Sequence, residues 1–296
     1  MSIARHGEIE LAYDRVGPPQ GEPLLFILGV GVQLIACPDQ LCAALVERGF
    51  QVARFDNRDV GLSTHLTAAG RPSRLGLVLK PSSAAAYGLD DLADDAVAVL
   101  DALAWRQAHI VGISQGGMTA QRLAVRHPDR VLTLTSISSS PSPAIGRLGV
   151  RTMVRAVAAA RRPIRSAEDC ARHFVDLQPV IGSPAYPVDE ESLRDLGRAT
   201  YRRGHDQAGV ERQSSAFQSS GDRAAELAAI SAPTLVIHGE ADRLVRPVGG
   251  RATAEAIPGA RLVMIPGMGH DLPRELWPRI VDEIAATARV APAESR

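Results

Sequence analysis

The pattern of apolar and polar residues along this chain predicts strands and helices in alternation. Mostly apolar runs of five to seven residues predict strands buried on both faces of a sheet. They lie at residues 24–28, 51–55, 108–113, 131–137, 234–239 and 261–266. Residues 8–14 alternate instead, as a half-buried strand does, and residues 89–104 have the clearest helical spacing. Strands alternating with helices predict an α/β protein with a mostly parallel, doubly wound sheet.

This alternation stops between residues 138 and 230. The segment opens with SSSPSP and then shows only helical patterns, near residues 145–160, 167–177, 189–203 and 206–219. The strand-helix rhythm returns afterwards, with helices expected near residues 247–257 and 272–288. We therefore predict an α/β core made of residues 1–137 and 231–296, with residues 138–230 inserted as a helical cap.

Composition excludes several classes of protein. The chain has 296 residues, 45% of them hydrophobic, and its 33 basic residues balance 33 acidic ones, whereas a nucleic-acid-binding protein usually has a basic excess. Its three cysteines, Cys37, Cys42 and Cys170, are too few and odd in number for a disulfide framework. Neither a signal peptide nor a run of about 20 apolar residues is evident. We expect a cytoplasmic protein that binds neither nucleic acid nor membranes.

The strongest chemical motif is Gly112-Ile113-Ser114-Gln115-Gly116, between a predicted strand and a predicted helix. A G-x-S-x-G motif alone is weak evidence, but this context is that of a nucleophile elbow. The serine of such an elbow occupies a sharp, strained turn whose neighbours must be small, and glycines flank Ser114 on both sides. The helix N-terminus also stabilises negative charge beside it. Ser114 is the predicted nucleophile.

An acid and a histidine should follow the serine in sequence, each just after a late strand. Asp242 follows the strand 234–239, and His270 follows the strand 261–266 in a glycine-rich loop. Both should emerge at the carboxyl edge of the sheet, as Ser114 does. Glu240 is a rival acid, but Asp242 is further from the strand end. The predicted triad is Ser114, His270 and Asp242.

An oxyanion hole requires two backbone N–H groups. One should belong to Gln115, directly after the nucleophile, and we assign the other to Val30, in the loop after the strand 24–28. No metal-ligand spacing such as H-E-x-x-H occurs, so we expect no metal. Asp56, Arg58 and Asp59 lie after another strand, and we interpret them as a structural charge network.

With these motifs in place, the chain resembles the α/β-hydrolase superfamily and, more narrowly, the aclacinomycin methylesterase-like branch from actinobacterial polyketide pathways. The motifs are GEIELAYDRVG, FDNRDVGLST, YGLDDLADDAVAVLDAL, GISQGG, APTLVIHGEADRLVRP and ARLVMIPGMGHDLP. The resemblance implies the same triad and oxyanion donors, and hydrolysis of a carboxylic ester without a cofactor. The chain departs at Leu28, where many relatives have His, and at Gln115, where Met is more frequent.

The resemblance and the cap together predict the kind of substrate. A cap of this size can roof a deep pocket that buries a bulky apolar ligand. We therefore expect a small-molecule apolar ester, a methyl ester on a polyketide-like polycyclic compound. The same triad could instead cleave a thioester or a carbon–carbon bond beside a carbonyl, and the fold could also serve as a noncatalytic ligand-binding protein.

Overall fold

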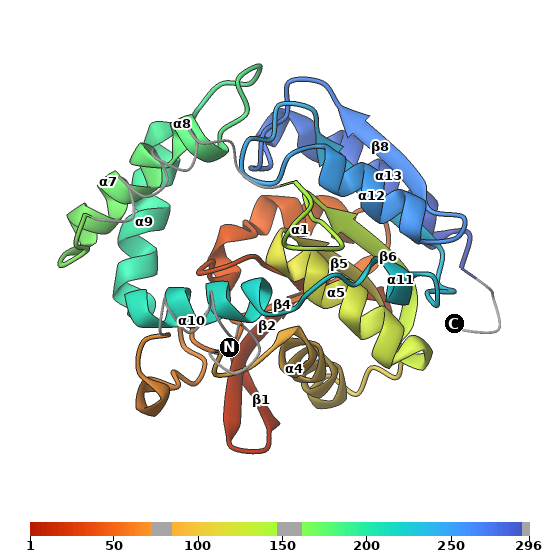
Figure 1. Ribbon diagram of the computed structural model, residues 1–296, viewed down its shortest axis with the longest axis horizontal. Helices are drawn as coiled ribbons and strands as arrows, with labels where there is room; N and C mark the ends of the chain where they lie inside the picture. Colours follow the sequence, from red (N-terminus) through yellow and green to blue (C-terminus); the bar gives the residue numbers. More distant parts are fainter. Residues whose placement is uncertain (73–84, 147–161, 292–296) are drawn as a thin grey trace.

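The computed structural model describes residues 1–72, 85–146 and 162–291. Within these ranges eight strands form one sheet in the order β1-β2-β4-β3-β5-β6-β7-β8 (Figure 1). The strands are β1 Ser2–His6, β2 Ile9–Val16, β3 Glu22–Ile27, β4 Phe50–Phe55, β5 Ala108–Ile113, β6 Val131–Ile137, β7 Thr234–Gly239 and β8 Arg261–Ile265. The pairs β1–β2 and β2–β4 are antiparallel, and the remaining pairs are parallel. The predicted mostly parallel α/β sheet is confirmed.

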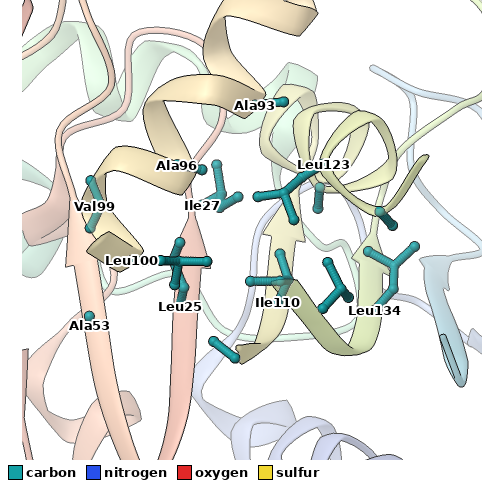
Figure 2. Close-up of a cluster of buried hydrophobic side chains, with 14 of the residues drawn as sticks. Leu25, Ile27, Ala53, Ala93, Ala96, Val99, Leu100, Ile110, Leu123 and Leu134 are labelled. Carbon is teal, nitrogen blue, oxygen red and sulfur yellow. The ribbon is translucent and has the colours of Figure 1, made fainter. Parts of the chain in front are cut away.

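Helices cover both faces of this sheet. They are α1 Asp39–Val46, α4 Leu89–Ala102, α5 Gln115–Arg126, α12 Val248–Ala256 and α13 Trp277–Ala288. One buried cluster joins β3 residues Leu25 and Ile27 to α4 and α5, and Figure 2 shows Leu100 and Leu123 of those helices in it. The next residue along β3, Phe26, belongs to a second cluster with α1 and α13. Because helices cover both faces of the sheet, the sequence of β3 is largely a continuous apolar run.

Two local features differ from the sequence pattern. β1 was not expected, because its residues alternate polar and apolar over only one short stretch, and Ala4 alone is buried in it. It is an edge strand that pairs with β2 only, so it has little core to cover. The last helix begins at Trp277, not near residue 272, since a 3₁₀ turn at Arg274–Leu276 precedes it and Pro278 occupies its first turn.

The chain between β6 and β7 contains the helices α7 Ala167–Asp176, α8 Gln178–Ile181, α9 Glu190–Gly204, α10 Gln207–Gln218 and α11 Ala224–Leu227. In Figure 1, α7, α8, α9 and α10 form an arc along one side of the α/β core, and α7 packs against α9. The described part of this segment contains no strand, while most of the helix expected near residues 145–160 lies outside the described residues. Leu227 and Ile230, at its end, pack into the first core cluster.

We call the residues 162–218 of this arc the cap. That the whole insertion spans residues 138–230, as the sequence predicts, stays a prediction.

Among the helices of the described ranges, none has the combination of length and apolar character that crossing a membrane requires.

Candidate active site

Ser114 occupies a strained turn between β5 and α5. Its backbone has φ 57° and ψ −123°, a conformation that costs free energy for any residue other than glycine. A Cβ atom at Gly112 would lie 2.2 Å from the carbonyl oxygen of Gly116, and one at Gly116 would lie 2.1 Å from that of Ile27. Both positions therefore require glycine. The turn leaves Ser114 partly exposed at the carboxyl edge of the sheet, where a ligand can reach it.

The structure brings Ser114, His270 and Asp242 into one hydrogen-bonded chain. His270 Nε2 lies 2.9 Å from Ser114 Oγ, and His270 Nδ1 lies 2.7 Å from Asp242 Oδ2. The loops after β5, β7 and β8 supply the three residues. The side chain of Asp242 is fully buried, whereas that of His270 is 9% exposed.

The surroundings of Asp242 determine its charge. Burial by itself would raise the pKa of this carboxyl, but the electrostatic attraction of His270 and hydrogen bonds with His238 and His270 outweigh burial and hold the pKa well below its usual range. Its other oxygen, Oδ1, accepts hydrogen bonds from the backbone N–H groups of Leu244 and Val245, both at 2.9 Å. An ionised carboxylate can only accept, so Nδ1 of His270 carries the proton and Nε2 is free to accept from Ser114.

Glu240, the rival acid, and the nearby His238 have other surroundings. Glu240 is exposed and its backbone N–H binds the carbonyl oxygen of Ile265. His238 is fully buried, with Nε2 2.8 Å from the carbonyl oxygen of Val245 and 3.5 Å from Asp242 Oδ2. The geometry thus pairs His270 with Asp242 and not with Glu240.

The loop after β3 runs directly beside the nucleophile. A Cβ atom at Gly29 would lie 3.1 Å from the Cβ atom of Ser114, a tight contact that glycine avoids. The hydrogen bonds of the described residues leave the backbone N–H groups of Val30 and Gln115 without a partner. These are the two donors expected for an oxyanion hole, one on each side of the serine.

The cap contacts the histidine loop through residues that the sequence did not single out. The backbone N–H of His270 donates to the carbonyl oxygen of Ile181 at 2.7 Å. Ser183 Oγ accepts a 2.7 Å hydrogen bond from the N–H of Gly269 and donates to the carboxylate of Asp271. Burial raises the pKa of Asp271, although the Ser183 hydrogen bond opposes the rise. No motif marks Ser183, because its partners lie more than 80 residues away in the chain.

A second group of ionisable residues lies where α10 meets the loop after β4. Ligand atoms of Asp59, His65 and Asp206 lie within 4.8 Å of one another, the arrangement that a metal ion would need. Arg212, however, donates to Asp59 Oδ1 at 2.6 Å and to Asp206 Oδ2 at 2.9 Å, and Tyr87 donates to Asp59 Oδ2. The guanidinium supplies the positive charge that a cation would otherwise bring, so the group forms an ion-pair network.

A cavity of about 420 Å³ lies between the N-terminus of α4 and the end of α10. Its lining includes Tyr87, Leu89, Arg122 and Arg223, and none of the residues of the hydrogen-bonded chain described above. This cavity is therefore separate from the surroundings of Ser114.

Known proteins resemble this chain in sequence and in fold. The family of the alpha/beta hydrolase fold matches residues 32–273. Rhodomycin D methylesterase DauP of Streptomyces sp. (strain C5) is 32% identical over 309 residues, and DnrP of Streptomyces peucetius, of the same name, is 31% identical; each match covers 96% of both chains. A solved meta-cleavage product hydrolase from Pseudomonas fluorescens IP01 superposes with a TM-score of 0.75 over 99% of this chain and 98% of that one. At 21% identity, that likeness concerns the fold alone.

Proposed function

The chain belongs to the alpha/beta hydrolase fold family, and we propose that it is a serine hydrolase that cleaves carboxylic esters. Ser114 is the nucleophile, His270 the general base and Asp242 the acid that orients it. The observation that carries this proposal is the continuous hydrogen-bonded chain from Ser114 Oγ to Asp242 Oδ2, set on a strained turn. The resemblance to the methylesterase branch, expected from the motifs, is confirmed by the two Streptomyces relatives.

The reaction proceeds by acyl transfer in two steps. His270 Nε2 takes the proton of Ser114 as Oγ bonds to the ester carbonyl carbon, and the tetrahedral intermediate then collapses. The alcohol leaves with the proton returned by His270, and the acyl group stays on Ser114. Water then gives a proton to His270 and attacks the acyl carbon, which releases the acid and restores the serine. Asp242 stays ionised throughout and stabilises the protonated imidazole.

The oxyanion of each intermediate faces the backbone N–H groups of Val30 and Gln115 in this proposal. Removing one donor from such a site typically costs about 10² to 10³ in kcat. Both donors belong to the backbone, so the departures at Leu28 and Gln115 from the residues common in relatives leave the donors intact. The side chain of Leu28 packs in the second core cluster, and the amide of Gln115 donates to the carbonyl oxygen of Gln213.

The proposed substrate is a methyl ester carried by a polyketide-like polycyclic compound, with methanol and the free acid as products. Support comes from the names of the two relatives, which match the chain over nearly its whole length. A cap beside the carboxyl edge of the sheet also suits a ligand whose rings bind away from the reacting bond. Binding energy from such rings would orient the ester, so truncated esters should lose kcat as well as affinity.

A substrate panel tests this proposal. It comprises a polycyclic methyl ester, a short p-nitrophenyl ester, an acyl thioester and a vinylogous diketone, with Ser114→Ala as the background. We expect the highest kcat/KM for the polycyclic methyl ester. A higher value for the thioester or the diketone would contradict the methylesterase assignment, and an activity that persists in Ser114→Ala would contradict the triad as well.

A further inference from the structure

We propose that Gln213, a residue of α10 in the cap, is a positioning residue that holds both sides of the oxyanion hole. The proposal rests on the proposed ester hydrolysis and extends it to a residue outside the triad. Gln213 is fully buried. Of its three hydrogen bonds to other segments, two end at the segments that supply the oxyanion donors and the third ends at Arg58, in the loop after β4.

The first bond fixes the loop after β3. Gln213 Oε1 accepts a 2.7 Å hydrogen bond from the backbone N–H of Gly31, the residue directly after the donor Val30. On the other side of the donor, Asn57 Nδ2 donates to the carbonyl oxygen of Leu28 at 3.1 Å. The loop is thus held at Leu28 and at Gly31, and the two residues between them have little freedom to move.

The second bond fixes the start of α5. Gln115 Nε2 donates to the backbone carbonyl oxygen of Gln213 at 2.6 Å. The backbone N–H of this same Gln115 is the other oxyanion donor. One residue of the cap therefore binds both donor segments, which lie in separate loops of the core.

The third bond fixes the amide of Gln213 itself. Its Nε2 donates to the carbonyl oxygen of Arg58 at 2.8 Å, so the amide nitrogen and oxygen cannot exchange places without losing both partners. Next to it, Arg212 anchors the same helix through a 2.6 Å ion pair with Asp59. The helix also packs tightly on the loop, because a Cβ atom at Gly31 would lie 2.8 Å from a methyl group of Val210.

Hydrogen bonds that position the oxyanion donors should affect kcat more than they affect KM. Donors must lie within hydrogen-bond distance of the position that the oxyanion takes in the transition state, and an error of about 1 Å can cost about 100-fold in rate. The three hydrogen bonds of Gln213 described above end on neither the serine nor the histidine, so the proton transfers within the triad should be unaffected by their loss. The cap then contributes to the alignment of the catalytic donors in addition to covering the substrate.

The test compares Gln213→Met with Gln218→Met, an exposed glutamine at the end of the same helix. Methionine keeps the length of the side chain but forms neither of the amide hydrogen bonds. Each variant is assayed with a p-nitrophenyl ester and with the matching thionoester, whose sulfur accepts hydrogen bonds weakly and gains little from an oxyanion hole. All rates are divided by the active-site concentration from fluorophosphonate titration, which removes any effect of a smaller folded fraction.

We expect Gln213→Met to lower kcat for the ester by about 30- to 100-fold, with KM changed less than about threefold. Its rate on the thionoester should fall far less, so the preference for the ester drops at least about tenfold. Gln218→Met should match the wild type in both rates. If Gln213→Met does not fold, Gln115→Met removes the second bond while keeping the backbone donor, and it should change the preference in the same direction by a smaller factor.

An unchanged ester preference would overturn the role of Gln213, whether both rates fall together or neither falls. Failure of the proposed function has a different signature: a wild type that turns over neither compound, or a Ser114→Ala variant as active as the wild type. In that case the assignment of Gln213 falls with the triad.

Discussion

Two regions meet at Ser114, and they reach it in different ways. The core loops after β5, β7 and β8 place the serine, the acid and the histidine through strand ends and obligatory glycines. The cap reaches the same site through Ile181, Ser183 and Gln213. Their hydrogen bonds end on the loops after β3, β4 and β8 and on the side chain of Gln115, and none of them ends on the reacting atoms. In the proposed mechanism, the core therefore carries the chemistry and the cap aligns it.

This difference has a measurable consequence. Changes to the core residues should abolish kcat, because they remove a group that forms or breaks a bond. Changes to the cap residues should lower kcat by one or two orders of magnitude, because the groups remain but are less well placed. The comparison fails if a cap substitution lowers kcat as much as a triad substitution does.

The largest effect is expected for Ser114→Ala. Loss of the nucleophile should lower kcat by about 10⁶-fold, as in a comparable serine hydrolase, while the fold is retained. The measurement is kcat on a p-nitrophenyl ester, with circular dichroism as the check on folding. Retention of more than about 1% of the activity in a well-folded variant would remove Ser114 from the mechanism.

The next largest effect separates the two acids of the loop after β7. Asp242→Asn should lower kcat by about 10⁴-fold, because the amide favours the wrong tautomer of His270. Glu240→Gln is the matched control two residues away, and since Glu240 is exposed and apart from His270, its kcat should stay within about twofold. A larger loss of kcat in Glu240→Gln than in Asp242→Asn would show that Glu240, and not Asp242, orients His270.

A cap residue should give a smaller effect. Ser183→Ala removes the hydrogen bond to the N–H of Gly269 and the contact with Asp271, which together support the histidine loop. We expect kcat to fall by about tenfold, since the loop keeps the bond between His270 N–H and the carbonyl of Ile181. Steady-state kcat is measured for Ser183→Ala and for Ser192→Ala, a matched control at the exposed start of α9. Equal activities for the two variants would show that Ser183 supports nothing at the site.

The smallest effect concerns stability and pH. Burial raises the pKa of Asp271 above its unfolded value, so the folded state binds this proton more tightly than the unfolded state does. Ionising Asp271 therefore costs stability, and the cost grows as the pH rises above about 4, the unfolded pKa of an aspartate. Melting temperatures of the wild type and Asp271→Asn between pH 4 and 8 test this. The wild type should lose stability relative to the variant as the pH rises, and a relative gain would contradict the assignment.

The sequence predicted the core well for physical reasons. Strands covered on both faces read as apolar runs, and the elbow at Ser114 needs glycines that are visible as a motif. His270 and Asp242 follow strand ends, so the parallel sheet brings them to one edge. The edge strand β1 gave no such signal, since only Ala4 of its five residues is buried.

The contacts of the cap could not be predicted in the same way. Gln213 binds Gly31 across 182 positions of the chain, and Gln213 and Arg212 are buried polar residues where a helix pattern favours apolar ones. Their environment depends on how α10 lies against the loops after β3 and β4, which is a property of the tertiary structure. Residue spacing carries information about strand ends, but not about which helix of an insertion lies over them.

Identification of the residue that a fluorophosphonate modifies tests the central claim most directly. The protein is incubated with the probe until activity is lost, and the modified peptide is then mapped by mass spectrometry. We predict one adduct per chain, on Ser114, formed in step with the loss of ester hydrolysis, and no adduct in Ser114→Ala. Complete inactivation with the label on any other residue would contradict the assignment of Ser114 as the nucleophile.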